Sequence, residues 1–416
     1  MSMLVLAGSD YNLLARSGAT VTPSPAADAL FPVAALYDRD PGTIFKFGSL
    51  TADPTITLDL GETPPNGDFE DAFVGGLPTA AWGKTSGATL TRNASTPRSG
   101  AGCLQASGDL AEYGYFDLAA HAGAAFIFQA AARTVGGNCL AQVRVRNLHT
   151  GSMLKSDGTW SATPIEFLST SATSYSFSSQ AATVETPESG PSVMTLRVEL
   201  VCHNQGGDTP LYDDVALFFG VDFASLHGHN LDPLVVVELR SSTDGFSGSN
   251  TLEATLTKRR GAFYGKLASV VCRRYWRLKF VGTNSAAIYL GEWVLGAAYA
   301  LAQPPGYPFA VELLAPQIRV PLPYGAPAVY GVGLTVQPAS LGLSFGFNGD
   351  AALAEFQREV FERSLDGSPL VLVPDDSKPE VYLVRCPDRM SRPRTGWTFH
   401  QVEMVFESLR LPLVVA

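Results

Sequence analysis

Charged residues are scarce in this chain of 416 residues: they make up 16% of it, against about a quarter in an average soluble domain. Long helices rely on Glu, Lys and Arg, so this shortage, together with 40 glycines and 28 prolines, favours short strands joined by tight turns. The chain also lacks any apolar run near the length of a transmembrane helix. The composition therefore predicts a soluble, mainly β protein with no membrane insertion.

Paired cysteines and an excess of positive charge are missing as well. The five cysteines are far apart, form no Cys-x-x-Cys pair and have no histidines at zinc-binding spacing, so we expect free thiols. A net charge of −10 opposes binding to phosphate backbones, which argues against a nucleic-acid partner. No positive segment precedes the first apolar stretch, so we expect synthesis in a cytoplasm without a signal peptide.

Sequence signatures of catalysis are also lacking. The chain contains no Gly-x-Ser-x-Gly and no His-Glu-x-x-His motif, and His227 and His229 have no third ligand nearby, so we expect them to be structural. We therefore expect a protein that is not an enzyme. Paired carboxylates for glycoside hydrolysis stay open as an alternative, because their separation is a three-dimensional fact.

What is present is short-range periodicity. Apolar and polar residues alternate over residues 55–60, which predicts a half-buried strand. One helix is predicted at residues 351–365, with Asp350 as its N-cap. Its apolar face is expected to consist of Leu353, Phe356, Val360 and Phe361.

Residues 18–61 resemble the first half of a discoidin-like (F5/8 type C) jelly roll, mainly through the Phe-Pro-Val-Ala-Ala-Leu-Tyr-Asp-Arg-Asp-Pro-Gly-Thr-Ile run at 31–44. The remaining strands of such a module are found much later, at residues 226–231, 241–245, 274–279 and 288–293. Similar modules occur in bacteriophage tail proteins. The resemblance implies one discontinuous jelly roll made of residues 1–63 and 221–300.

Between these halves, Asn-Gly-Asp-Phe-Glu at 66–70 and Leu-Tyr-Asp-Asp-Val-Ala-Leu at 211–217 look like the opening and closing strands of a carbohydrate-binding-module jelly roll of the family 4, 9 and 22 kind. Both motifs lie where the outer domain is interrupted. Insertions at exposed loops are tolerated because the ends of a domain usually lie close together. Residues 64–220 are therefore predicted to be an inserted jelly roll.

Residues 301–416 begin with a proline-rich linker. Their element order is similar to the tail-tube-like sandwich of distal tail and baseplate proteins from long-tailed phages, in which such domains form rings. The predicted fold is thus mainly β, with two β-sandwich jelly rolls, one inserted in the other, and a C-terminal β-sandwich with one packed α-helix.

The resemblance to carbohydrate-binding modules implies a structural Ca²⁺ in the inserted jelly roll, with Glu70 and Asp213 as ligands. Ca²⁺ takes six to eight oxygens and often ties the first strand of a jelly roll to its last. Alternation along residues 211–217 places Asp213 on the inward side of its strand. Solvated turn carboxylates are the alternative.

Sugar binding needs aromatic faces and a few convergent polar groups. Tyr113 and Tyr115 are two residues apart and share a face on a strand, and Trp160 lies in a Gly/Ser-rich stretch, so these three are the candidates for a glycan platform. Ordinary packing is the alternative for all three. Trp82 is expected in the core.

A basic cluster precedes the last predicted strand and consists of Arg385, Arg389, Arg392 and Arg394. In an acidic chain with ring-forming domains, such a loop can pair with an acidic surface on a neighbouring subunit. We therefore treat these arginines as candidate assembly residues, with a solvated loop as the alternative.

Together these features predict a structural protein of a long-tailed bacteriophage tail tip, located in the virion. We expect a homo-oligomeric ring, hexameric or trimeric, that contacts other tail-tip and tail-tube proteins and presents its jelly rolls to a host cell-surface glycan. The alternatives are a carbohydrate-binding surface or accessory protein outside viruses and a glycan-cleaving tail enzyme.

Overall fold

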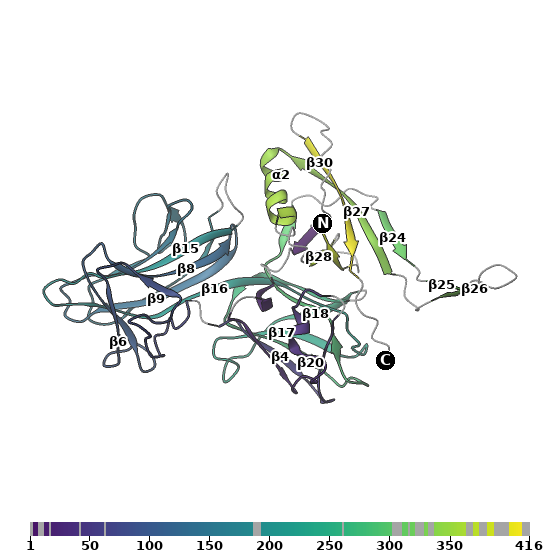
Figure 1. Cartoon of the computed structure of the whole chain (residues 1–416), viewed down its shortest axis with the longest axis horizontal. Coiled ribbons are helices and arrows are strands. Elements are labelled where there is room, and N and C mark those ends of the chain that lie inside the picture. The colour runs from purple at the N-terminus through teal and green to yellow at the C-terminus, as the bar shows by residue number, and fades with distance from the viewer. Residues whose placement is uncertain are drawn as a thin grey trace. The chain divides into compact units, whose positions relative to one another are not determined.

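The computed structural model describes the chain except for fifteen short segments, which are residues 1–2, 7–11, 16–17, 41–42, 62–63, 186–192, 260–261, 302–309, 315–316, 321–327, 332–336, 363–368, 374–380, 387–398 and 410–416. Nearly all of the described regular structure consists of antiparallel strands, with one α-helix, α2 (Asp350–Phe356) (Figure 1). The predicted fold class is confirmed. Within the described residues, no helix has the length and hydropathy that a membrane crossing requires.

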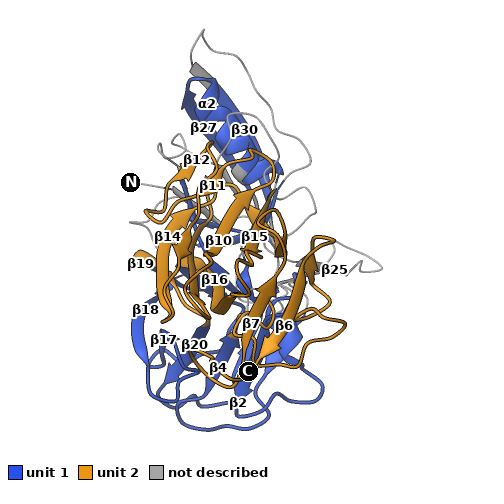
Figure 2. Ribbon diagram, turned by 90° about the vertical axis from the view of Figure 1, so that its left-hand side faces the viewer, with its two compact units in different colours: residues 1–58, 222–268, 275–416 blue, residues 59–221, 269–274 orange. Residues whose placement is uncertain are grey.

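The chain forms two compact units, shown in separate colours in Figure 2. Unit 1 contains residues 1–58, 222–268 and 275–416, and unit 2 contains residues 59–221 and 269–274. Three strands, β4 (Thr55–Asp59), β16 (Pro210–His227) and β19 (Ala262–Cys272), contribute residues to both units. The division into three domains stays a prediction.

Unit 2 is built from two antiparallel sheets. The β8 sheet has the order β12-β11-β10-β15-β8-β5, with β13 beside β10. Its strands are β5 (Trp82–Lys84), β8 (Tyr113–His121), β10 (Ala141–Asn147), β11 (Met153–Leu154), β12 (Trp160–Ser161), β13 (Leu168–Thr170) and β15 (Val193–Val201). The second sheet joins the first part of β16 to β6 (Thr89–Asn93), β7 (Cys103–Ser107), β9 (Ala125–Thr134) and β14 (Ser176–Thr183).

The two sheets of unit 2 enclose an apolar core. Phe128 on β9 meets Phe167, which precedes β13, with 4.8 Å between ring centroids. Tyr212 on β16 is fully buried, and its hydroxyl donates to the carbonyl of Val201 at 2.6 Å and accepts the N–H of Gln142 at 3.0 Å. A buried hydroxyl therefore ties the second sheet to the backbone of the β8 sheet.

In unit 1, one group of strands surrounds β20 (Tyr275–Val281), whose apolar and polar residues alternate. Trp276, Leu278 and Phe280 are buried, while Arg277 and Lys279 lie on the outer face. Besides β4 and the parts of β16 and β19 that belong to unit 1, this group contains β2 (Thr20–Ser24), β3 (Phe45–Lys46), β17 (Val236–Ser242), β18 (Thr251–Arg259), β21 (Tyr289–Leu290) and β22 (Trp293–Gly296). Two short 3-10 turns, Leu13–Ala15 and Val33–Leu36, accompany them.

Unit 1 also holds a seven-stranded sheet with the order β23-β1-β28-β29-β30-β27-β24. Its strands are β1 (Met3–Leu6), β23 (Tyr299–Leu301), β24 (Ala310–Leu314), β27 (Gln337–Asn348), β28 (Pro369–Val373), β29 (Tyr382–Arg385) and β30 (Phe399–Ser408). A separate hairpin consists of β25 (Gln317–Val320) and β26 (Ala328–Gly331). The first strand of the chain thus pairs with β23 and β28, and not with the discoidin-like strands to which residues 1–63 were assigned from the sequence.

Strand β28 of this sheet is buried on both faces. Leu370 and Leu372 join a cluster with Phe356 of α2, while Val371 and Val373 join another with Phe223. A strand buried on both sides reads as a continuous apolar run, which is what Pro-Leu-Val-Leu-Val shows.

The predicted helix is present, but its start and its end differ from the prediction. The helix begins at Asp350 and its N-cap is Gly349, with a φ of 94° and no capping side chain, so Asp350 lies in the first turn and not at the cap. Only glycine adopts such a φ readily. The α-helix ends at Phe356 and continues as a π-helical turn, Gln357–Phe361. Its apolar face packs in the core as predicted.

Candidate functional site

Tyr113, Tyr115 and Asp117 lie side by side on the outer face of β8, while the intervening Gly114 and Phe116 face the core. The two tyrosine rings meet edge to face, with 6.0 Å between their centroids. The shared face expected from their spacing is what the strand shows.

Arg197 on the neighbouring strand β15 fixes this row of side chains. Its Nε and Nη2 donate to the two carboxylate oxygens of Asp117, each at 2.7 Å, and its guanidinium lies 4.0 Å from the centre of the Tyr115 ring. Hydrogen bonding to Asp117 is the main reason why the pKa of Arg197 is raised. A two-pronged ion pair of this kind holds the arginine in one orientation.

Two further ion pairs continue across the sheet to β10. Arg146 lies 3.1 Å from Glu199 of β15, and Arg144 lies 3.1 Å from Glu166. We call the resulting surface the polar face. It consists of Tyr113, Tyr115, Asp117, Arg144, Arg146, Glu166, Arg197 and Glu199.

Glu199 is the unusual member of the polar face. Only 1% of it is exposed, and burial raises the pKa of its carboxyl in spite of the opposing charges of Arg146 and Arg144. Its Oε2 has no hydrogen-bond partner within the described chain. A buried acceptor without a partner is costly, and the charges of Arg146 and Arg144 offset part of that cost.

Gly83 of β5 makes room for the Tyr115 ring. A Cβ at this position would lie 2.4 Å from Tyr115 Cζ, so the ring lies directly across the glycine backbone. The tyrosine is therefore held in place from two sides, by Gly83 and by Arg197.

Trp160 is not on the polar face. Trp160 of β12 is paired with Leu154 of β11. The residue before Leu154, Met153, is paired with Arg146 of β10, so Leu154 and Trp160 lie on the same side of the sheet as the core residue Val145. This side is opposite to the polar face. The indole N–H of Trp160 donates to the carbonyl of Thr183 at 2.7 Å, at the end of β14. The structure thus brings together two of the three predicted platform aromatics.

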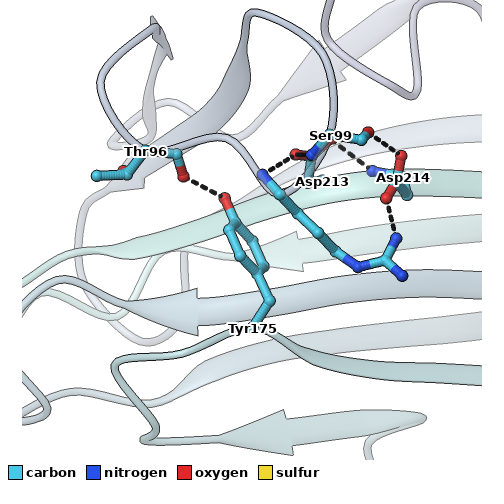
Figure 3. A network of polar contacts seen from close by, with 6 residues as sticks. Thr96, Ser99, Tyr175, Asp213 and Asp214 are labelled. Atoms are coloured by element: carbon cyan, nitrogen blue, oxygen red, sulfur yellow. Dashed lines mark hydrogen bonds and ion pairs between the residues drawn. The ribbon is translucent and has the colours of Figure 1, made fainter.

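The two predicted calcium ligands hold one loop from different positions. Asp213 is fully buried, but not on the inward side that alternation predicted, because Tyr212 faces the β8 sheet and a β-bulge follows Asp213. Its carboxylate lies under the loop and accepts the N–H groups of Arg98 at 2.7 Å and Ser99 at 3.3 Å (Figure 3). Burial raises the pKa of Asp213 to about 6. The next residue, Asp214, accepts the Ser99 hydroxyl at 2.7 Å and pairs with the Arg98 guanidinium.

Glu70 binds the far end of the same loop. Its carboxylate accepts the N–H of Ala101 at 2.7 Å and that of Gly102 at 3.3 Å. Glu70 and Asp213 fit a Ca²⁺ site only in part, because their carboxylate oxygens already accept backbone N–H groups. In addition, the described residues contain no group of three or more His, Cys, Asp or Glu side chains that could hold a metal ion. Backbone carbonyls and water would have to supply the remaining ligands.

The remaining candidate residues, Trp82, His227, His229 and the cysteines, have structural roles. Trp82 is 2% exposed and donates its indole N–H to Pro65 at 2.8 Å, so the core placement is confirmed. Burial lowers the pKa of His227 to about 3 and that of His229 to about 4, which keeps both rings neutral. All five cysteines are free thiols.

Of the four candidate assembly arginines, only Arg385 belongs to the described chain, at the end of β29. Arg389, Arg392 and Arg394 lie outside the described residues.

Six polar-face residues were not predicted from the sequence, namely Asp117, Arg144, Arg146, Glu166, Arg197 and Glu199. A signal was present in the alternation of Val143-Arg144-Val145-Arg146 and Arg197-Val198-Glu199, which places charged residues on one side of two strands. What the sequence does not contain is the register that sets these strands side by side.

No protein-family model and no curated protein matches the chain. Among solved structures, the CBM22-1 xylan-binding domain of Xyn10C from Paenibacillus barcinonensis is similar at 14% identity over 36% of this chain and 90% of that domain, with a TM-score of 0.27. The tandem CBM22-1-CBM22-2 domain of Xyn10C shows 10% identity over 55% of this chain and 96% of its own, with a TM-score of 0.26. The enzymatically active domain of tailspike protein 4 from bacteriophage CBA120 shows 14% identity over 38% of this chain and 22% of its own, with a TM-score of 0.24.

Proposed function

We propose that unit 2 binds a glycan on the polar face and that Tyr113 and Tyr115 form its aromatic platform. The observation that carries this proposal is the pair of outward-facing tyrosines, of which Tyr115 is held in one orientation by Arg197 and Gly83. Sugar sites combine aromatic rings, which contact C–H groups, with a few oriented polar groups, which select hydroxyls.

The ligand class follows from the charges. The polar face carries three arginines, and each is paired with one of the three carboxylates Asp117, Glu166 and Glu199. Since these formal charges cancel, the face suits a neutral glycan, whose hydroxyls can donate to the exposed Asp117 and accept from Arg197. Binding without a covalent step is the proposed activity.

The first test is Tyr115→Ala, assayed on a glycan array and then by calorimetry on any hit. Loss of one stacking ring should weaken binding about tenfold or more. Phe177→Ala is the matched control, because Phe177 is an exposed aromatic on β14, outside the polar face. Equal losses in the two variants, or a flat array with folded protein, would argue against the proposal.

Glu199→Gln separates hydrogen bonding from packing, since it keeps the shape of the side chain and removes its charge. We expect weaker glycan binding, because Arg146 loses its charged partner, and a melting temperature that is unchanged or higher, because burial of the charged carboxyl is unfavourable. Unchanged affinity would remove Glu199 from the site.

The second candidate function is that of a structural protein in a phage tail tip. It is supported by the sequence resemblances and by Val405 of β30, an apolar side chain that is 60% exposed and lies opposite Gly342 of β27. The proposed ring is a hexamer or trimer in the virion. Mass photometry should show the oligomer and its loss in Val405→Asp, and monomers at tens of micromolar would contradict it.

Calcium in unit 2 is a further part of the proposal, with Glu70 and Asp213 as ligands. If the ion binds, EDTA should lower the melting temperature and Glu70→Gln should abolish that sensitivity. A melting curve that EDTA leaves unchanged would assign both carboxylates to holding the loop by its N–H groups alone.

A further inference from the structure

A second pair of arginines lies on the outer face of unit 1. Arg240 of β17 and Arg277 of β20 are directly opposite each other in the register of these antiparallel strands. Both alternate with buried residues, so their side chains share the outer face. Like charges directly opposite each other are destabilising in a sheet.

Within the described chain, Arg277 has no carboxylate partner that would offset this repulsion. Its Nε donates to the Thr57 hydroxyl at 2.9 Å, and its guanidinium lies 3.8 Å from the centre of the Phe246 ring. None of the ion pairs in the described chain includes Arg277, and both of its terminal nitrogens are without a hydrogen-bond partner there. Burial and the charge of Arg240 lower the pKa of Arg277, and no neighbouring acid opposes them.

Arg240 is only partly neutralised. Its Nε donates to Glu238 at 2.8 Å and its Nη1 to the Asn250 side chain at 3.2 Å. The next cation on the face, Lys279, already pairs with Asp53 at 3.3 Å. One positive charge is therefore left over, in a chain whose net charge is −10.

The polar face provides a comparison within the same molecule. Arg146 and Arg197 are also directly opposite each other, on β10 and β15, but Glu199 and Asp117 neutralise them. Arg240 and Arg277 on unit 1 are also directly opposite each other, but only Arg240 has a carboxylate partner, Glu238. A bound anion would neutralise Arg277.

The loop beside Arg277 is rigidly built. Asp244 accepts the N–H groups of Gly248 and Ser249, each at 2.8 Å, and the hydroxyl of Ser242 at 2.8 Å. These bonds occupy the nearest loop carboxylate and support Phe246, which has a φ of 69°. The Arg277 guanidinium is thus held between Phe246 and Thr57, with its terminal N–H groups unpaired.

We propose that Arg240 and Arg277 form an oxyanion-binding site, separate from the polar face, for a glycan that carries a carboxylate. A guanidinium presents a planar fork that matches a carboxylate in two-pronged geometry, which the two terminal nitrogens of Arg277 can supply, while Arg240 adds a second positive charge opposite it. Phosphate and sulfate groups share this chemistry. The site would give the protein a second, acidic ligand beside the neutral glycan.

The test uses the full chain with Tyr115→Ala, so that the polar face does not contribute, and trigalacturonic acid as the probe at low salt. Arg277→Gln should weaken binding about tenfold or more, and Arg277→Lys should weaken it less because the charge remains. Lys155→Gln removes one positive charge elsewhere and should leave the affinity unchanged. Added salt should weaken binding to the unsubstituted site.

Melting curves give a second measurement. Arg277→Gln should raise the melting temperature at low salt by removing the repulsion, and trigalacturonic acid should stabilise the protein with Arg277 and not the variant. Stabilisation by phosphate or sulfate alone would support the oxyanion site and assign it to a phosphorylated or sulfated glycan. The proposal would be overturned if the Arg277→Gln variant and the protein that keeps Arg277 bound trigalacturonic acid with equal affinity. It would also be overturned if none of these anions stabilised the protein.

Discussion

Glu292 shows what burial does to a single carboxyl group. It is 3% exposed, and burial raises its pKa from the usual 4.5 to about 8, with a further contribution from the negative charge of Asp38. Because the folded-state pKa is above the unfolded one, the protonated group is compatible with the fold below pH 4.5. Stability is then lost as the pH rises through about 8.

Glu292→Gln should therefore leave stability nearly unchanged at pH 5 and increase it at pH 9, by up to about 5 kcal/mol. Urea unfolding at both pH values, in EDTA so that no divalent cation neutralises the carboxylate, measures the difference. The same effect at both pH values would show that Glu292 does not titrate as the burial implies.

Tyr212→Phe tests the hydroxyl that joins the two sheets of unit 2. Its removal leaves the Gln142 N–H and the Val201 carbonyl without a partner in the core, so the free energy of unfolding should fall by about 1–3 kcal/mol. Tyr175→Phe is a suitable control, because the Tyr175 hydroxyl donates to a loop carbonyl, that of Thr96, at 3.0 Å. Equal losses in the two variants would mean that the cross-sheet bonds contribute nothing special.

At the residue scale, sequence reasoning succeeded where one strand contained all the information. The spacing of Tyr113 and Tyr115 determined their common face. Alternation failed for Asp213, because a β-bulge after this residue changes which face the following residues share, and Tyr212 is the residue that faces the core. Sequence reasoning also did not separate Trp160 from the tyrosines, since that depends on how the β11–β12 hairpin pairs with the rest of the sheet. Glu199 was not predicted as a site residue because its burial depends on the two arginines from β10.

At the scale of elements, the unexpected feature is β1. It is an interior strand of the seven-stranded sheet, with β23 on one side and β28 on the other. Pairing between strands that are about 300 to 370 residues apart leaves no local pattern in the sequence. The helix boundary is a similar case, because nothing in the alternation of apolar residues indicates a change to π-helical geometry after Phe356.

Removing residues 1–6 should expose the edges of β23 and β28. Unpaired edges promote association between chains, so we expect a lower melting temperature for unit 1 and aggregation in size-exclusion chromatography. Replacing Leu4 and Leu6 by valine retains β propensity and should have little effect. A truncated protein that stays monomeric and melts as before would show that β1 is dispensable.

At the scale of the whole molecule, two units with separate cores predict that one can be removed. Deleting residues 66–220 and joining Gly61 to Val221 should leave cooperative melting, because unit 1 retains its apolar clusters around Phe356 and Phe223. Calorimetry measures the remaining transition. Loss of cooperativity, with residues 66–220 also unfolded in isolation, would mean that the two units form one folding unit.

The position of β1 also sets an order of events on the ribosome. About 365 residues separate β1 from β28, and at 5–20 residues per second their synthesis takes about 20–70 s. During that time the nascent chain carries Leu4, Val5 and Leu6 without their β28 partners, while every strand of unit 2 has already emerged. Slower translation should prolong this interval and increase the dependence of the protein on chaperones.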